Sequence, residues 1–302
     1  MAVKSATAWK YRIFQKTFKF RLLILGKICY TISYNIFNIH ILFSEMRGVG
    51  MFAEVNGFNI HYVEAGEGPD VLLLHGWGAS VDSWCGVIET LSHSCHLVAL
   101  DFPGCGKSSL PDRPLTTDDY MALVMEFCNV VNFRNPILIG HSHGCRVIMK
   151  LCGVGLMSPE KVVLIDGAGL KPKFNLKKSV KQCTFKTIRR VLTLPGLKNH
   201  TEGLLNKARS HFGSADYNSA PEVMRKTLVN LVNDDMTPYI DGIKASTLLI
   251  WGENDTATPL YMAKILEKTI PDCGLCVIKN TGHWSFVERP IEAHAILNSF
   301  LP

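Results

Sequence analysis

From Met51 onward, the hydrophobic positions of the chain change between two periods, and this change predicts a succession of strands and helices. Two segments with a period of two residues flank Asn56-Gly57, which is typical of a β-hairpin with a two-residue turn. Short runs of consecutive apolar residues follow, as expected for strands that helices cover on both faces. These runs lie within residues 71–74, 95–109, 137–139, 161–169, 246–259 and 274–286.

Helical patterns separate these strands. Thr116 followed by Asp119 predicts a capped helix start, and the apolar positions after it extend the helix to about Val131. Another apolar helix is expected to begin near Cys145, and residues 290–301 are expected to close the chain as a helix. Strands and helices in alternation predict an α/β fold with a mostly parallel sheet flanked by helices.

Residues 170–242 interrupt this alternation, because they contain helical patterns without a convincing core strand. Ser219 with Glu222 predicts a capping box ahead of a helix over residues 223–232. We therefore expect a helical cap insertion at about 170–242. Its residues 170–215 hold eleven basic side chains and one acidic side chain, which indicates either a solvated face or a surface that attracts anions or membranes.

The first 50 residues differ from the rest of the chain and are predicted to form a separate extension ahead of a domain at 51–302. Residues 1–44 hold seven basic side chains and no acidic one. Arg21–Phe43 is long enough to cross a bilayer, but Lys27, at up to about +3 kcal/mol, and several polar residues nearly cancel its apolar contribution. Its apolar residues recur at helical spacing, as in an amphipathic helix that makes peripheral contact with a membrane. The alternatives are an organellar targeting segment and an extension without function.

Composition places the rest of the chain among ordinary globular proteins. Of the 302 residues, 47% are hydrophobic, which is enough for a large core. The net charge of +6 comes from residues 1–44, because the rest of the chain holds 25 of the 32 basic residues and all 26 acidic ones. A nearly neutral body gives no reason to expect a nucleic-acid partner. Ten cysteines scattered through strands and helices favour a reducing compartment, so a cytoplasmic location is expected.

Two short patterns that suggest a ligand fail on their spacing. Cys273 and Cys276 form a C-x-x-C, but no second cysteine or histidine pair follows at zinc spacing. Residues 106–108 (GKS) look like the end of a phosphate-binding loop, yet the earlier glycine of such a loop would fall at Asp101. We therefore expect neither a metal nor an organic cofactor.

The main candidate for chemistry is Ser142, in a Gly-x-Ser-x-Gly sequence between a predicted strand and a predicted helix. This order is typical of a nucleophile elbow, a sharp turn that exposes the serine hydroxyl. Gly140 and Gly144 have a mechanical reason, because a side chain at either would collide with the neighbouring strand or helix. The helix N-terminus beneath Ser142 favours negative charge near the hydroxyl.

A serine nucleophile needs a base to take its proton and a carboxylate to orient that base. His283 and Asp255 each follow an apolar run, where loops gather at the carboxyl edge of a parallel sheet, and they are the first candidates. Asp166 follows the preceding predicted strand and is the rival carboxylate. The elbow is expected to point its two flanking histidines away from the serine hydroxyl, and a third histidine to support the nearby glycine-rich loop; these are His141, His143 and His75.

Five segments resemble the landmarks of the α/β-hydrolase family, in the same order: HGWG (75–78), DFPGCGKS (101–108), GHSHG (140–144), WGENDTATP (251–259) and GHW (282–284). The resemblance covers residues 51–302 and points to the broad serine-nucleophile branch that includes esterases, C–C bond hydrolases and proline iminopeptidases. The serine at 142 excludes the dehalogenase and epoxide-hydrolase branches, whose nucleophile is aspartate. Cys145 departs from the family pattern, in which many members carry a second glycine.

The resemblance implies a role for each matching residue. Ser142 would be the nucleophile, His283 the base and acid, and Asp255 the carboxylate that orients His283. The oxyanion hole would be formed by the backbone N–H groups of Trp77 and His143. No cofactor and no metal are implied.

The function expected first is hydrolysis of a carboxylic ester or a related small acyl substrate, through an acyl-enzyme. Trp77, Trp284 and Phe286 are candidates for an apolar lining that would suit a substrate with an apolar part. A C–C bond hydrolase or a peptidase is the alternative within the same fold. A ligand receptor with slow or no turnover is the alternative from another class.

Overall fold

The computed structural model describes residues 50–172 and 215–301. The chain divides into two compact units, Met1–Arg47 and Gly48–Pro302, and all elements below belong to the second. The basic extension, with its predicted amphipathic helix, lies outside the described residues, as does nearly all of the basic stretch of the predicted insertion. Within the two described ranges, no helix combines the length and the apolar character needed to cross a membrane.

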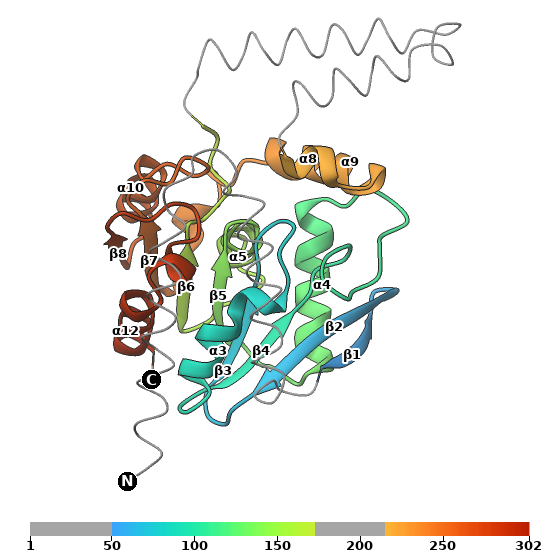
Figure 1. Ribbon diagram of the computed structural model, residues 1–302, viewed down its shortest axis with the longest axis horizontal. Coiled ribbons are helices and arrows are strands. Elements are labelled where there is room, and N and C mark those ends of the chain that lie inside the picture. The colour runs from blue at the N-terminus through green and yellow to red at the C-terminus, as the bar shows by residue number, and fades with distance from the viewer. Residues whose placement is uncertain (1–49, 173–214, 302) are drawn as a thin grey trace, which may run out of the picture. The chain divides into compact units, whose positions relative to one another are not determined.

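An eight-stranded sheet organises the second unit (Figure 1). The strands are β1 Met51–Val55, β2 Phe58–Ala65, β3 Asp70–Leu74, β4 His96–Leu100, β5 Ile137–His141, β6 Lys161–Ile165, β7 Ser246–Gly252 and β8 Cys273–Ile278. They lie in the order β1-β2-β4-β3-β5-β6-β7-β8. The pairs β1/β2 and β2/β4 are antiparallel and the other pairs are parallel. The predicted mostly parallel sheet is therefore confirmed.

The first two strands form the predicted hairpin. Val55 pairs with Phe58, so Asn56 and Gly57 alone make the turn. Both turn residues have positive φ, 51° and 81°. A two-residue hairpin turn of this kind requires positive φ at both positions, which asparagine and glycine adopt at low cost.

Helices cover both faces of the sheet (Figure 1). The helices in the described ranges are η1 Val81–Trp84, α3 Cys85–Leu91, α4 Thr117–Val130, α5 His143–Gly153, α8 Ala215–Ser219, α9 Glu222–Asn233, η2 Ile240–Gly242, α10 Tyr261–Thr269, α11 Ser285–Glu288 and α12 Pro290–Phe300. Leu72 and Leu74 of β3 pack in one core with residues of α4, α5 and α10, whereas Val71 and Leu73 pack in a second core with α3 and α12. Alternate residues thus enter opposite cores, which explains the continuous apolar runs in the sequence.

Both predicted helices form, but only one of the two predicted capping boxes is confirmed. At the start of α4, Thr116 Oγ1 accepts the N–H of Asp119 at 3.3 Å, and the Asp119 carboxylate accepts the N–H of Thr116 at 2.7 Å. The second capping box does not form, because Ser219 ends α8 and α9 begins at Glu222 with Pro221 as its N-cap. The φ of Pro221, −55°, is fixed by its ring at a value suited to the approach to a helix, although proline has no side-chain acceptor.

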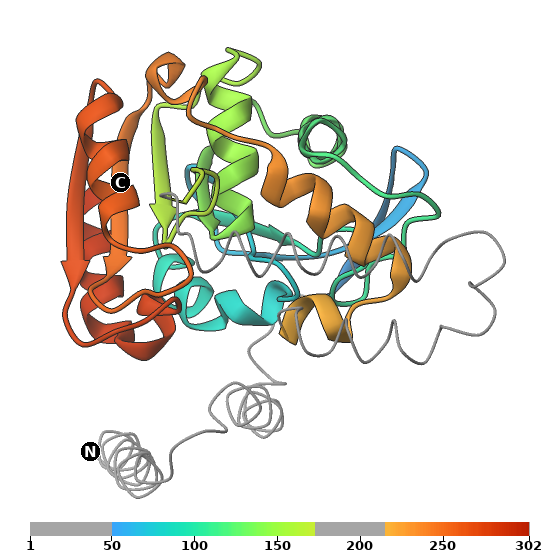
Figure 2. The ribbon, with the colours of Figure 1, turned by 90° about the horizontal axis from the view of Figure 1, so that it is seen from above.

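The described end of the predicted insertion is attached to the loop that leads into α4. Thr227 Oγ1 of α9 accepts the N–H of Leu115 at 3.0 Å, and Asn230 donates to the Leu115 carbonyl at 3.1 Å. Met224 lies against Gly104, where an added Cβ would come 2.5 Å from the Met224 sulfur. In Figure 2, α4 is seen end-on and α9 runs past it. Two side chains of α9 thus bond the backbone of Leu115 and help to fix α9 to the body of the protein.

Candidate active site

The carboxyl ends of the parallel strands bring five predicted residues to one edge of the sheet. Trp77 follows β3, Ser142 follows β5 and Asp166 follows β6, while Asp255 follows β7 and His283 follows β8. Each parallel strand ends at the same edge, so its loop lies beside the loops of its neighbours. Residues separated by more than a hundred positions in the sequence meet there for this reason.

Ser142 occupies a strained turn between β5 and α5. Its φ and ψ are 48° and −105°, outside the regions that a residue with a Cβ normally adopts. The backbone holds this conformation through two hydrogen bonds of 3.0 Å, from Ser142 N–H to the Ile165 carbonyl and from Ala168 N–H to the Ser142 carbonyl. The predicted elbow thus forms on β6 as well as on β5, and the strain is concentrated at the serine.

Both glycines of the elbow stand where a side chain has no room. A Cβ at Gly144 would lie 2.0 Å from the Leu74 carbonyl oxygen of β3, and a Cβ at Gly140 would lie 2.7 Å from the backbone nitrogen of Cys145. The predicted collisions with the neighbouring strand and helix are confirmed. Cys145, the departure from the family pattern, is fully buried and its thiol donates to the Gly140 carbonyl at 3.0 Å. A small thiol therefore fits where many relatives carry glycine.

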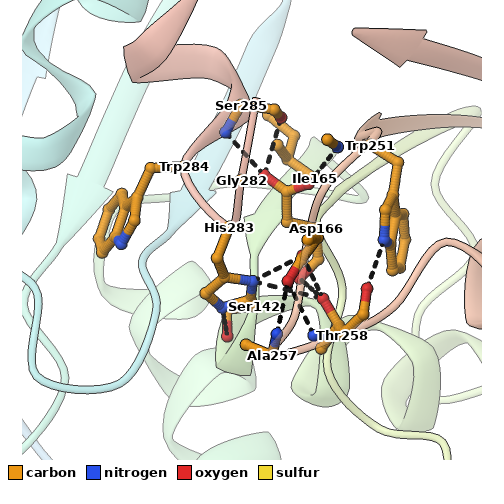
Figure 3. Close-up of polar contacts among 12 residues, drawn as sticks. Ser142, Ile165, Asp166, Trp251, Ala257, Thr258, Gly282, His283, Trp284 and Ser285 are labelled. Carbon is orange, nitrogen blue, oxygen red and sulfur yellow. Dashed lines mark hydrogen bonds and ion pairs between the residues drawn. The ribbon is translucent and has the colours of Figure 1, made fainter. Parts of the chain in front are cut away.

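His283 lies between Ser142 and Asp255. Figure 3 shows His283 beside Ser142. Its Nε2 is 2.9 Å from Ser142 Oγ, and its Nδ1 is 2.8 Å from Asp255 Oδ2. An ionised carboxylate only accepts hydrogen bonds, so Nδ1 carries the proton of the neutral ring and Nε2 is the acceptor for the serine hydroxyl. The arrangement can take the proton of Ser142 without any rotation of the imidazole.

The carboxylate of Asp255 is held by four hydrogen bonds in all. Besides the ring of His283, the backbone N–H groups of Ala257 and Thr258 donate to Oδ1 at 2.8 and 2.9 Å. The hydroxyl of Thr258 donates to Oδ2 at 2.7 Å. Burial alone would raise the pKa of Asp255, but the hydrogen bonds from His283 and Thr258 hold that pKa below its ordinary value. Asp255 is therefore ionised near neutral pH, and Thr258 is a contributor to the site that the sequence analysis missed.

Asp166, the rival carboxylate, contacts other groups. Its Oδ1 accepts the N–H of Gly252 at 2.8 Å, and its Oδ2 accepts both the N–H and the hydroxyl of Ser285, at 2.9 and 2.7 Å. Burial raises the pKa of Asp166 to about 6, because these hydrogen bonds offset only part of the cost of removing the charge from water. The structure thus places Asp255, and not Asp166, beside the imidazole of His283. Ser285 was also missed, although it follows the GHW segment directly.

Two of the neighbouring histidines support backbone groups. His75 donates from Nδ1 to the Gly76 carbonyl at 2.7 Å, and its Nε2 accepts the N–H of Phe102 at 2.9 Å. It thereby supports the loop that carries Trp77, as expected. His141 donates from Nε2 to the main-chain carbonyl of His283 at 2.8 Å, and burial lowers the pKa of His141 to about 3.

The third histidine, His143, has an aromatic environment. It is 5% exposed, and its ring centroid lies 6.2 Å from that of Trp77, 5.3 Å from Phe102 and 4.7 Å from Tyr120. Neither ring nitrogen hydrogen-bonds a residue in the described part of the chain. Burial, reinforced by the positive charge of Arg146, lowers the pKa of His143 well below its ordinary value, so the ring is neutral.

The two backbone segments that carry the predicted oxyanion-hole residues, Trp77 and His143, lie beside the serine. His143 is the first residue of α5, so its N–H has no carbonyl one turn earlier to accept it. Gly76, which precedes Trp77, approaches the serine closely, because a Cβ there would come 3.2 Å from Ser142 Cβ. The loop after β3 and the start of α5 therefore flank Ser142, as an oxyanion hole requires.

Of the three aromatic residues expected near the site, two remain partly accessible. Trp77 and Trp284 are partly exposed, and the Trp284 ring lies 4.3 Å from that of His141. The expectation for Phe286 is wrong, because it is 2% exposed and packs against Trp84 with a centroid distance of 5.0 Å. In residues 50–172 and 215–301, no group of three or more His, Cys, Asp and Glu side chains is placed to hold a metal ion.

Several known hydrolases are similar to this chain. A hydrolase of 2-hydroxy-6-oxo-6-(2'-aminophenyl)hexa-2,4-dienoic acid from Metapseudomonas resinovorans is 28% identical over 85% of this chain and 92% of its own. The human monoacylglycerol lipase ABHD6 is 26% identical over 78% of this chain and 76% of its own. Among solved structures, a bacterial membrane phospholipase A superposes with a TM-score of 0.68 at 22% identity, covering 96% of this chain and 97% of the other.

A family profile matches the part of the chain that holds most of the sheet and its loops. The sequence profile described as the alpha/beta hydrolase family matches residues 71–295, which include every residue of the site described above. Because the match spans well over half of the chain, the protein belongs to the alpha/beta hydrolase family.

Proposed function

We propose that the protein is a serine hydrolase that cleaves a carboxylic ester or a related acyl compound through an acyl-enzyme. The observation that carries this proposal is the pair of hydrogen bonds at His283, 2.9 Å to Ser142 Oγ and 2.8 Å to Asp255 Oδ2. A serine hydroxyl is a weak nucleophile near neutral pH, and an imidazole in this position accepts its proton as the oxygen attacks.

The proposed reaction proceeds in two halves. Ser142 Oγ attacks the acyl carbon while His283 Nε2 takes the hydroxyl proton, and Asp255 stabilises the imidazolium that results. The backbone N–H groups of His143 and Trp77 donate to the oxyanion of the tetrahedral intermediate. His283 then protonates the leaving group, and the acyl group remains on Ser142. In the second half, His283 activates a water molecule that hydrolyses the acyl-enzyme and restores the serine.

The surroundings of Ser142 favour a small substrate with an apolar part. Trp77 and Trp284 are partly exposed and lie next in the chain to groups of the site. The two histidines that flank Ser142 in the sequence are both held neutral by burial. An uncharged, partly aromatic surface beside the nucleophile suits an alkyl or aryl acyl group better than a charged one.

Labelling with a fluorophosphonate tests the nucleophile. We expect the wild-type protein to be labelled and to hydrolyse p-nitrophenyl esters, and Ser142→Ala to lose both properties while it remains folded. Ser246→Ala is the control, because the Ser246 hydroxyl donates to Asp272 at the end of β7 opposite to the site. Full esterase activity in the Ser142→Ala protein would refute the assignment. A panel of acyl chain lengths then defines the substrate.

Asparagine variants of the two carboxylates test which of them orients the base. We expect Asp255→Asn to lower kcat by about 10⁴-fold, because an asparagine favours the wrong tautomer of His283. Asp166→Asn is expected to do much less, since Asp166 does not contact the imidazole. The reverse ranking would assign the orienting role to Asp166.

A second candidate function is cleavage of a C–C bond in a dienoic acid. The observation that favours it is the 28% identity to a protein named for hydrolysis of such an acid. Comparison of kcat/KM for a 2-hydroxy-6-oxo-dienoic acid and for the ester panel separates the two candidates. A protein that binds these compounds without multiple turnover would instead be a ligand receptor.

A further inference from the structure

The loop that carries His283 is held in place by groups that lie outside the Ser142–His283–Asp255 chain of hydrogen bonds. The imidazole itself contacts Ser142 and Asp255, but the backbone on either side of it must be fixed for the ring to point correctly. Gly252, at the end of β7, packs directly against this loop, because a Cβ there would lie 2.0 Å from the Gly282 carbonyl oxygen. The position of the loop is therefore coupled to the end of β7.

Asp166 connects the end of β7 to the same loop (Figure 3). Its Oδ1 accepts the N–H of Gly252, and its Oδ2 accepts the N–H and the hydroxyl of Ser285, two residues after His283. The Asp166 backbone is itself fixed, because its N–H donates to the Ile250 carbonyl at 3.0 Å. One carboxylate thus joins three segments, the ends of β6 and β7 and the first residue of α11.

Every donor to Asp166 is buried and neutral. Asp166 and Ser285 have no exposed surface, so water does not compete for these hydrogen bonds. Burial raises the pKa of Asp166 to about 6, so the carboxylate is ionised at pH 8 and accepts from all three donors. Hydrogen bonds to a charged acceptor are stronger than those between neutral groups, which suits a group that has to hold a loop in one position.

A second buried residue holds the other side of the histidine. His141 donates from Nε2 to the main-chain carbonyl of His283 at 2.8 Å, and its ring lies 5.1 Å from the His283 ring. Since His141 directly precedes Ser142, this hydrogen bond joins the serine turn to the histidine loop. The backbone of residues 283–285 is therefore bonded on one side to the elbow and on the other side to Asp166.

We propose that Asp166 is a positioning residue for His283, which acts by fixing Ser285 and thereby the direction of the imidazole toward Ser142. The proposal rests on the function proposed above, because it assigns His283 the part of base. Asp166 touches neither the serine nor the imidazole through a hydrogen bond, so its effect on turnover is transmitted through the loop. A displacement of a reacting group by about 1 Å lowers rates by about 100-fold, which sets the scale of the expected effect.

The test measures kcat and KM at pH 8 for Asp166→Asn and Ser285→Ala with p-nitrophenyl esters. Asparagine has the size of aspartate, but it cannot accept from Gly252 and from Ser285 at once, because one of its two terminal atoms is a donor. We expect Asp166→Asn to lower kcat by about 10- to 100-fold with KM changed by less than about threefold. Ser285→Ala removes the hydroxyl but keeps the N–H, so a smaller loss of kcat is expected.

A matched pair of controls comes from the other end of β7. Ser246 Oγ donates to Asp272 Oδ2 at 2.7 Å, the same distance as in the Ser285–Asp166 hydrogen bond. Asp272→Asn and Ser246→Ala therefore remove a serine-to-aspartate hydrogen bond of the same length at an exposed site remote from the histidine loop. We expect kcat of both control variants to stay within about twofold of the wild type, in line with the small effects of surface substitutions.

The decisive comparison places Asp166→Asn in a His283→Ala background. If Asp166 acts through His283, the residual turnover of the His283→Ala protein should not fall further when Asp166→Asn is added. An equal loss of turnover with and without His283 would show that Asp166 supports the fold or the elbow instead, and would overturn the proposal. Unchanged kcat in Asp166→Asn would overturn it as well. Ser285→Ala carries the same comparison if the aspartate variant does not fold.

Failure of the proposed function gives a different result. In that case the wild-type protein itself would not be labelled by fluorophosphonate at Ser142, and His283→Ala would not change its turnover. Wild-type labelling at Ser142 together with an unaffected Asp166→Asn variant would refute the positioning role alone.

Discussion

Replacing His143 by methionine is expected to stabilise the protein, and to stabilise it more at low pH than at high pH. The imidazole is 5% exposed, and neither nitrogen hydrogen-bonds a residue of the described ranges. Methionine has a similar volume, fits irregular apolar surroundings and is a better helix former than histidine. The backbone N–H of residue 143 stays in place, so the substitution changes only the side chain.

The expected gain at pH 8 is the difference between two terms. A buried polar group without a partner costs about 1–3 kcal/mol. The contacts of the ring with Phe102 and Tyr120, at centroid distances of 5.3 and 4.7 Å, contribute about 0.5–1.5 kcal/mol each, but a methionine sulfur beside the same rings restores about 0.3–1.5 kcal/mol each, so only a small part of the gain is lost. We therefore expect His143→Met to raise the free energy of unfolding by about 1 kcal/mol at pH 8.

Lower pH should increase this gain. The pKa of His143 in the folded protein is lowered well below its ordinary value of 6.5, mainly by burial. Below pH 6.5 the unfolded chain binds a proton at this residue that the folded protein does not bind, so wild-type stability is lost as the pH falls. The methionine variant has no such loss. The difference grows by about 1.4 kcal/mol per pH unit, which gives an expected gain of about 2–2.5 kcal/mol at pH 5.5.

Urea unfolding of both proteins at pH 8.0, 6.5 and 5.5 measures these values. His93→Met is the control for the substitution itself, because His93 is exposed. A difference between wild type and His143→Met that stays constant from pH 8.0 to 5.5 would refute the reasoning, since the imidazole would then bind its proton equally in both states. A net loss of stability at pH 8 would show that the ring has a partner.

Two further substitutions test the packing at Gly144 and the cap of α4, and one truncation tests the extension. Gly144→Ala should prevent folding or turnover, because its Cβ would lie 2.0 Å from the Leu74 carbonyl oxygen; a variant with the wild-type Tm and kcat would contradict this packing. Thr116→Ala should lower the free energy of unfolding in urea by about 1 kcal/mol through loss of the capping box, with kcat unchanged. A protein that begins at Met51 should retain turnover of soluble esters but should no longer co-sediment with anionic vesicles. Added salt should weaken the binding of the full chain to such vesicles. Equal vesicle binding by both proteins would exclude the extension as a membrane contact.

The turn at Ser142 and the order of the three site residues could be predicted from the sequence because their constraints are local. Gly140 and Gly144 must lack a side chain next to a strand and a helix, and this requirement leaves a pattern of five residues. Asp255 and His283 each follow a strand closely, so a parallel sheet alone is sufficient to bring their loops beside that of Ser142. Apolar runs of four or five residues identify such strands without knowledge of their partners.

Contacts between loops leave no such pattern in the sequence, so the features that depend on them could not be predicted. Ser285 is 119 positions from Asp166 in the chain, and nothing in its neighbourhood indicates that its hydroxyl is a donor to a carboxylate. The spacing of Ser219 and Glu222 fits a capping box, but α8 extends to Ser219, so that residue cannot also begin the next helix. Phe286 was expected at the site from its position in the sequence, whereas its packing against the sheet places it in the core.

The two buried carboxylates at this edge of the sheet differ in the groups that donate to them, and this difference separates their parts in the proposed reaction. Burial is the largest influence on each carboxylate, and by itself it would raise the pKa of both. Asp255 accepts a hydrogen bond from His283, which becomes a cation when it takes the proton of Ser142. Hydrogen bonds from His283 and Thr258 bring the pKa of Asp255 below the ordinary value. Asp166 receives only neutral donors, from Gly252 and Ser285, and its pKa stays raised at about 6. Of the two carboxylates, Asp255 is therefore the one that stabilises a growing positive charge on His283 through direct contact. Since the Asp166 oxygens are already occupied by backbone and hydroxyl donors, Asp166 cannot replace Asp255 without releasing the loop on which the imidazole depends.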